Sequence, residues 1–189
     1  NHAMNLFERT LLNVKSLSER KNGLDLSGVK KLDVRKKPVS DSIMLEVGKR
    51  IFCAKQNKNA VILMMGAHVI RSGVQNYLID LIKRGYISCI AMNGAGIIHD
   101  FELALIGATT ENVAHYIKDG QFGLWKETAR LNDIINESFK KNKSVGMGEA
   151  IGKYIEEKNL PNKSISILAC GYRLNIPVTV HVGIGYDIH

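Results

Sequence analysis

The sequence contains little cysteine and no long apolar run. Its three cysteines, Cys53, Cys89 and Cys170, are odd in number and far apart, and no pair has the spacing of a zinc finger. We therefore expect reduced, buried thiols rather than a disulfide framework or a metal site. The longest apolar run, residues 60–67, is too short to cross a bilayer, and we find no signal-peptide pattern. These absences predict a cytoplasmic protein with no membrane partner.

A net charge of +8 over 189 residues would by itself suggest a nucleic-acid partner. Its distribution argues against one, because +7 of that charge lies in residues 1–60 and the remainder of the chain is almost neutral. The basic stretch at residues 15–40 has no aromatic side chains interleaved with its charges. We interpret residues 1–59 as a basic arm with helices, either solvated or in contact with another subunit, and expect no nucleic-acid partner.

Strands and helices alternate from residue 60 onward. Apolar runs predict strands at 60–65, 87–92 and 177–182, and the first has the continuous pattern of a strand covered on both faces. Helices are predicted at residues 74–84, 100–106, 111–118, 127–140, 147–158 and 164–174. This order predicts an α/β fold, a Rossmann-like parallel sheet with helices on both faces, in a single domain over residues 60–189. Half of such a sheet is accounted for, so we expect the domain to be incomplete at its C-terminus.

Two glycine-containing turns follow the first two predicted strands. Residues 93–96 read Asn-Gly-Ala-Gly, and residues 66–73 form a second strand–turn–helix junction. Glycine lets a backbone approach a ligand closely, and a helix N-terminus offers N–H groups to an anion. Because the carboxyl ends of parallel strands meet at one edge, the two turns predict a nucleotide site there. The glycines at 146–152 follow a polar run instead of a strand, which favours an ordinary loop.

Polar side chains just beyond the turn at 93–96 are the candidate site residues. Asp100 by itself is better explained as a helix cap, although an acid at this edge would also suit an amine or a ribose hydroxyl. His99 can carry a proton near neutral pH. Trp125 follows Gly120 and Gly123 in the segment 120–125 and is either core packing or a lid, packing being the commoner role. No serine-nucleophile motif supports acyl transfer.

Residues 66–107 resemble the deoxyhypusine synthase family. The matching features are the Arg71-Ser72-Gly73 turn, the helix and strand after it, and the segment from Asn93-Gly94-Ala95 to His99-Asp100; residues 175–178 match more loosely. The resemblance implies a Rossmann-like NAD-binding domain that assembles as a homo-oligomer, a dimer or tetramer. It further implies NAD-dependent transfer of an aminobutyl group from spermidine or a related polyamine to an amine acceptor.

The same resemblance assigns residues to the ligands. NAD is expected against the two turns, at Ala67, Ser72, Gly73, Asn93, Gly94 and Ala95. The polyamine substrate is expected at His99, Asp100 and Asp187, with His99 as the catalytic candidate.

The chain also departs from that family. It contains no glycine-rich segment with the nucleophilic lysine, and Asn93 replaces a usual threonine. One alternative is therefore a non-catalytic paralogue that acts as a structural or regulatory subunit. Another is a different nucleotide enzyme that shares only the fold. Whether the chain is an enzyme remains open from the sequence.

Overall fold

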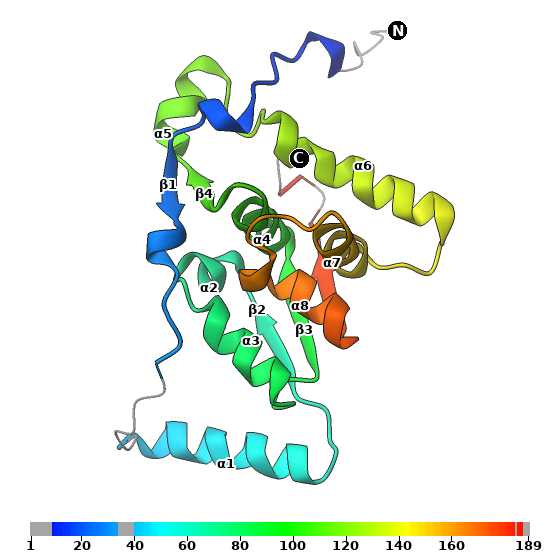
Figure 1. Ribbon diagram of the computed structural model, residues 1–189. Helices are drawn as coiled ribbons and strands as arrows, with labels where there is room; N and C mark the ends of the chain where they lie inside the picture. The colour runs from blue at the N-terminus through cyan, green and yellow to red at the C-terminus, as the bar shows by residue number, and fades with distance from the viewer. Residues whose placement is uncertain (1–8, 34–39, 184, 187–189) are drawn as a thin grey trace, which may run out of the picture.

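The computed structural model describes residues 9–33, 40–183 and 185–186 (Figure 1). The α-helices are α1 (Ser42–Gln56), α2 (Ala67–Arg71), α3 (Gln75–Lys83), α4 (Gly94–Ile106), α5 (Val113–Tyr116), α6 (Lys126–Lys141), α7 (Met147–Glu157) and α8 (Ile167–Leu174). The strands are β1 (Asn22–Asp25), β2 (Ile62–Met65), β3 (Cys89–Asn93), β4 (Ala108–Glu111) and β5 (Val178–His181). Short 3₁₀ turns are η1 (Arg9–Leu11), η2 (Leu17–Glu19), η3 (Leu26–Gly28), η4 (Ile117–Asp119) and η5 (Lys163–Ile165).

The main sheet is parallel and has the strand order β2-β3-β5. Ile62 of β2 lies opposite Cys89 of β3, and Ile90 lies opposite Val178 of β5. Both connections step in the same direction across the sheet, and right-handed crossovers then place their helices on the same face. The predicted α/β class with a parallel, Rossmann-like sheet is confirmed.

The two faces of this sheet differ in their covering. One face packs into the hydrophobic core formed with α3, α4, α7 and α8, and its residues are Leu63, Met65, Ile90, Met92, Val178 and Val180. On the opposite face of β2, Ile62 is 59% exposed and Met64 is 80% exposed. The prediction that this strand is covered on both faces is therefore wrong: its side chains alternate between core and solvent.

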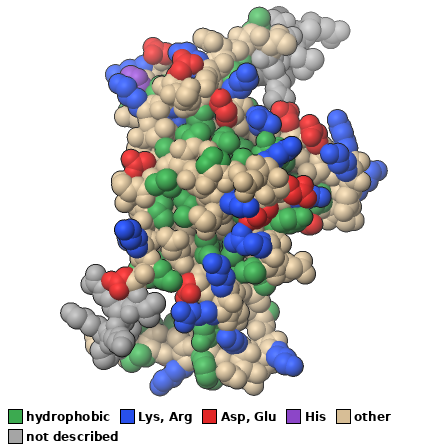
Figure 2. All heavy atoms as spheres, in the orientation of Figure 1, with side chains coloured by type: hydrophobic (Ala, Val, Ile, Leu, Met, Phe, Trp, Pro, Cys, Tyr) green, Lys and Arg blue, Asp and Glu red, His purple; other side chains and the backbone are tan. Residues whose placement is uncertain are grey.

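Helix α1 lies apart from the core helices (Figure 1). Its hydrophobic side chains, among them Ile43 and Phe52, are exposed, and hydrophobic groups are visible along it in Figure 2. Near its end, Lys55 donates to the Arg84 carbonyl at 2.6 Å. Cys53 on this helix is exposed, so the expectation of a buried thiol is wrong at that position.

The N-terminal segment is part of the packed structure. Strand β1 pairs antiparallel with β4, with Leu24 opposite Thr109. Leu17 is 1% exposed and packs with Trp125, while Arg20 is 7% exposed. The prediction of a solvated arm is wrong for these residues, because both an apolar and a charged side chain of the segment are buried against residues 101–128.

Charge and hydropathy add two observations. Lys and Arg side chains are spread over the face shown in Figure 2 and alternate with carboxylates. Over the described part of the chain, no helix has the length and apolar character needed to cross a membrane.

A pair of methionine variants tests the uneven covering of the sheet. Met64→Ala removes an exposed side chain and should change the free energy of unfolding by no more than about 0.5 kcal/mol. Met92→Ala on the core face should cost about 2–5 kcal/mol, because Met92 is 2% exposed. Urea denaturation of both variants measures the difference. Equal destabilisation would contradict the one-sided packing.

Candidate functional site

The carboxyl ends of β2 and β3 lie side by side at one edge of the sheet. β2 leads into Gly66, the N-cap of α2, and β3 leads into Gly94, the first residue of α4. A Cβ added to Gly66 would meet only the Asn93 side-chain nitrogen, 3.9 Å away. The two turns are therefore neighbours, and the space above Gly66 is open. Glycine there leaves room for a ligand to approach the backbone.

The strand order identifies which turn comes first at this edge. In doubly wound folds the first half of the sheet runs 3-2-1, and the phosphate-binding turn follows strand 1. Here β5-β3-β2 occupies those positions, so Gly66 stands in the first turn and Asn93 ends the second strand. The sequence pattern placed the 66–73 junction at this edge, but Gly66 was not included among the predicted cofactor residues. The strand order shows that its turn is the first of the sheet.

Four of the predicted cofactor residues lie at this edge. Ala67 begins α2 and is buried, and Gly94 begins α4. Asn93 caps α4 by accepting a hydrogen bond from the Gly96 N–H at 3.1 Å. Ala95 lines the cavity described below.

The other two predicted cofactor residues lie beyond the C-terminal end of α2. The Ser72 hydroxyl donates to the Val69 carbonyl at 2.7 Å. Gly73 has a φ of +75°, and a Cβ there would collide with the Gly28 carbonyl. The close packing of the N-terminal segment therefore explains why position 73 is a glycine. The placement of Ser72 and Gly73 therefore gives them local structural roles.

A cavity of about 310 Å³ lies next to the turn at the start of α4. Ala95 and His99 line it from α4, Thr110 and Glu111 from β4, and Arg71 from α2. Thr110 has a φ of +72°, unusual for a β-branched residue, and its buried hydroxyl has no hydrogen-bond partner among the described residues. A strained backbone and an unsatisfied hydroxyl beside a cavity are typical of ligand sites.

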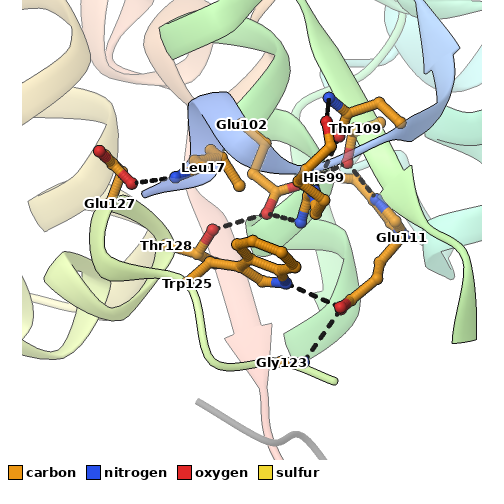
Figure 3. A network of polar contacts seen from close by, with 11 residues as sticks. Leu17, His99, Glu102, Thr109, Glu111, Gly123, Trp125, Glu127 and Thr128 are labelled. Atoms are coloured by element: carbon orange, nitrogen blue, oxygen red, sulfur yellow. Dashed lines mark hydrogen bonds and ion pairs between the residues drawn. The ribbon is translucent and has the colours of Figure 1, made fainter. Parts of the chain in front are cut away.

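A buried ion pair supports one wall of the cavity (Figure 3). The Arg20 guanidinium donates to both oxygens of Glu102, at 2.8 and 2.6 Å. The hydroxyls of Thr128 and Thr109 donate to the same carboxylate at 2.7 and 2.6 Å. Burial alone would raise the pKa of Glu102, but the Arg20 contacts and the threonine hydroxyls hold it below its ordinary value.

His99 is connected to this network. Its Nδ1 lies 2.7 Å from the Thr109 hydroxyl. Burial lowers the pKa of His99 to about 4, although the charge of Glu102 opposes that change and Arg71 reinforces it. The ring is therefore neutral at pH 7, and the expectation that it titrates near neutrality is wrong.

Asp100 lies on the core side of α4. Its carboxylate accepts hydrogen bonds from the Ser166 hydroxyl at 2.5 Å and from the Ile167 and Leu168 N–H groups at 2.8 and 3.2 Å. It thus caps α8 rather than its own helix, and its side chain is 1% exposed. Burial raises its pKa to about 6 against these hydrogen bonds. This placement contradicts a substrate contact by Asp100, and Asp187 lies outside the described residues.

Trp125 is packing rather than a lid. It is 1% exposed, and its indole N–H donates to Glu111 at 2.8 Å. The Gly123 N–H donates to the other Glu111 oxygen at 3.0 Å, which fixes that carboxylate at the cavity wall (Figure 3). Among the described residues, no group of three or more His, Cys, Asp or Glu side chains is arranged to hold a metal ion.

The family model described as "Arginine dihydrolase ArgZ-like, C-terminal, Rossmann fold" matches residues 45–148, more than half of the chain. A search of the curated proteins found no match. Among solved structures, a LOR/SDH protein from Methanococcus maripaludis S2 is 18% identical, with a TM-score of 0.51; the match covers 85% of this chain and 46% of that one.

An arginine dihydrolase and a protein solved with bound L-arginine also share the fold. The arginine dihydrolase ArgZ of the ornithine–ammonia cycle in cyanobacteria is 15% identical over 80% of this chain and 20% of its own, with a TM-score of 0.51. A cysteine-to-alanine mutant of AgrE with L-arginine is 19% identical over 81% of this chain and 21% of its own, with a TM-score of 0.50. The chain thus spans less than half the length of each of the three.

These findings correct the family expected from the sequence. The matched family is different from deoxyhypusine synthase, so that resemblance is wrong. The polyamine and spermidine substrates, the aminobutyl transfer and the non-catalytic paralogue all depended on it and are wrong with it. What the two families share in this segment is the strand, small-residue turn and helix of a Rossmann-like fold.

The ion pair can be tested by removing one partner. Arg20→Met leaves Glu102 buried without its counter-charge, which should destabilise the fold at pH 7 by about 3–5 kcal/mol. The pKa of Glu102 then rises, so part of the loss should be recovered as the pH falls and the carboxyl group protonates. Chemical denaturation at pH 7 and 5 measures this. The double variant Arg20→Met/Glu102→Gln should be more stable than Arg20→Met at pH 7; the reverse order would contradict the ion-pair argument.

The pH dependence expected for Asp100 is opposite to that of Glu102 in the wild type, because burial raises the pKa of Asp100 whereas the contacts of Glu102 hold its pKa low. The folded pKa of Asp100, about 6, is above the ordinary 3.8, so its favourable contribution at low pH is lost as the pH rises through 6. The stability difference between the wild type and Asp100→Asn should therefore shift toward the variant between pH 4 and 7. Asp100→Ala, which leaves three donors unpaired, should cost about 1–3 kcal/mol at pH 7. Thermal unfolding across this pH range tests both; a pH-independent difference for Asp100→Asn would contradict the assignment.

Proposed function

Because the chain belongs to the ArgZ-like C-terminal Rossmann-fold family, we propose that it binds NAD at the carboxyl edge of β2 and β3 and acts on an amino acid related to arginine in the neighbouring cavity. The observation that carries this proposal is the position of the Gly66 turn. It lies inside the family match and directly after the strand that occupies position 1 of the sheet.

The residues at this edge fit the phosphates of a dinucleotide. The open space over Gly66 permits close approach to the backbone, and α4, with 13 residues, directs its N-terminus to the same edge. Arg71 and His68 lie on α2 between this edge and the cavity, with 3.4 Å between their nearest side-chain nitrogens. When bound, NAD would supply a hydride acceptor; the chain supplies the binding edge and orientation.

The end of the second strand departs from the usual NAD pattern. An acidic residue normally binds the ribose hydroxyls there, and in this chain the position is held by Asn93. A carboxamide can hydrogen-bond a ribose hydroxyl, but it lacks the negative charge that repels the additional phosphate of NADP. We therefore propose weaker discrimination between the two nucleotides than an acid would give.

The cavity next to α4 suits a small polar molecule. Its volume of about 310 Å³ is at the lower end of the range for small-molecule sites. Arg71 offers a positive charge to a carboxylate, and Glu111 offers a carboxylate to a cationic side chain. Ala95 connects the cavity to the turn at the start of α4, so a ligand there would lie near a bound dinucleotide.

The cysteines favour this role over nucleophilic hydrolysis of a guanidinium group. Cys53 is exposed on α1, and Cys89 is a residue of β3. Cys170 is buried in the core, and burial raises the pKa of its thiol, which disfavours the reactive thiolate. None of the three lines the cavity beside His99.

We also propose a homo-oligomer in the cytoplasm, as expected from the sequence. The exposed hydrophobic side chains of α1 and of Ile62 and Met64 support self-association, because uncovered apolar surface favours burial in an interface. The three cysteines lie far apart in the sequence and on different elements, α1, β3 and α8, which suits a reducing compartment.

Binding of NAD can be tested with two glycine variants of the full chain. At one hundred times its dissociation constant, NAD should stabilise the wild type by about 2.7 kcal/mol and raise its melting temperature. Gly66→Val should fold, since the added Cβ meets only one atom at 3.9 Å, but should lose this shift because its side chain occupies the phosphate approach.

Gly48→Val on α1 is the matched control. A Cβ there meets nothing within 4 Å, so this variant should keep the full NAD-dependent shift. Absence of any shift in the wild type at millimolar NAD would refute the proposal. An unchanged shift in Gly66→Val would refute the assigned position of the phosphates.

A further inference from the structure

The hydrogen bonds around His99 determine which of its ring nitrogens carries the proton. Its Nδ1 lies 2.7 Å from the Thr109 hydroxyl oxygen, and that oxygen lies 2.6 Å from Glu102. Three groups thus form a chain from a buried carboxylate to a histidine at the wall of the cavity (Figure 3). Since Thr109 has a single hydroxyl hydrogen, it can donate to only one of its two neighbours.

Glu102 is the neighbour that receives this hydrogen. Arg20 donates to both of its oxygens, and Thr128 donates to one of them at 2.7 Å. A carboxylate that faces a guanidinium in this bidentate arrangement is ionised, so it has no proton to donate. The 2.6 Å separation between Thr109 and Glu102 therefore requires the hydrogen of the threonine, because two acceptors at that distance would repel.

The state of the imidazole follows from this step. The Thr109 oxygen, having donated to Glu102, accepts a hydrogen bond from Nδ1–H of His99. The ring is neutral at pH 7, because burial lowers its pKa, with Arg71, Arg20 and His68 reinforcing that effect and Glu102 opposing it. In a neutral imidazole with Nδ1 protonated, Nε2 carries a free lone pair.

We infer that His99 is a hydrogen-bond acceptor at the cavity, held in this tautomer by the positioning residues Arg20, Glu102 and Thr109. A ligand group placed against Nε2 must then be an N–H or O–H donor. Arg71 lines the same cavity and suits a carboxylate. Together they favour an acid with an amino group beside its carboxylate over the corresponding oxo acid. This selectivity rests on the proposed amino-acid site, whereas the tautomer does not.

Nitrogen NMR of the full chain tests the tautomer without any ligand. Long-range proton–nitrogen correlation of ¹⁵N-labelled protein distinguishes the two neutral forms, and His99→Gln identifies the His99 signals. At pH 7 the wild type should show Nδ1–H with Nε2 unprotonated. Thr109→Val removes the acceptor of that proton and should move the ring toward the Nε2–H form.

Thr109→Ser is the matched variant, because it keeps the hydroxyl. It should retain the wild-type tautomer, and the signals of His115 and His181 should stay unchanged in both variants. A folded wild type with Nε2–H or a charged ring at pH 7 would overturn the inference. An unchanged tautomer in Thr109→Val would overturn it as well, whereas a purely structural role for Thr109 would leave the tautomer unaffected.

Two probe molecules test the selectivity. L-arginine and 5-guanidino-2-oxopentanoate differ at one position beside the carboxylate, where L-arginine has a charged ammonium donor and the oxo acid has a neutral carbonyl acceptor. L-arginine should shift the Nε2 signal of His99 and should bind at least tenfold more tightly than the oxo acid. Thr109→Val should reduce this difference in affinity. If both compounds shift the His99 signals and bind with equal affinity, the proposed selectivity is overturned. If neither binds, the proposed amino-acid site fails, and the tautomer measurement still decides the state of His99.

Discussion

The bidentate ion pair between Arg20 and Glu102 joins parts of the chain that have no local reason to meet. Arg20 comes from the N-terminal segment and Glu102 from α4, and the carboxylate also receives hydroxyl hydrogens from β4 and α6. Desolvating two ions is expensive unless every polar atom is satisfied. Here both carboxylate oxygens accept two hydrogen bonds, so the pair fixes the N-terminal segment on the core. It also determines the state of His99, which couples assembly of the fold to the chemistry of the cavity.

The direction of the two strand connections has an equally broad effect. Because the steps from β2 to β3 and from β3 to β5 go the same way, the connecting helices lie on one face of the sheet, and Ile62 and Met64 on the other face of β2 are exposed. The same order makes the turn after β2 the first turn of the sheet. The uncovered strand and the proposed phosphate site are therefore two consequences of one topology.

Local patterns predicted the elements whose causes are local. Helices predicted at 127–140 and 147–158 begin and end within one residue of α6 and α7, because amphipathic spacing specifies them. The pairing of β1 with β4 was missed, since both strands have only four residues and β1 contains Gly23 and Asp25, so neither gives a periodic signal. The burial of Arg20 could not be predicted, because its partner lies 82 residues away in the sequence. The prediction that Asp100 caps its own helix is wrong, because α4 begins at Gly94 and the Asp100 carboxylate binds the first residues of α8, 66 residues further along the chain.

The mistaken family has a physical explanation of its own. A strand, a small-residue turn and an apolar helix are what any Rossmann-like fold requires at the ligand edge, so their presence identifies the fold and leaves the substrate open. In this chain only some of the polar groups that line the cavity belong to that matched segment, namely Arg71 and His99. Glu111 comes from the unpredicted β4, and Arg20, which acts on His99 through Glu102 and Thr109, comes from the N-terminal segment. The proposed substrate site therefore includes residues outside the glycine turns, in segments with weak sequence patterns. A motif confined to the turns can match families of different chemistry equally well.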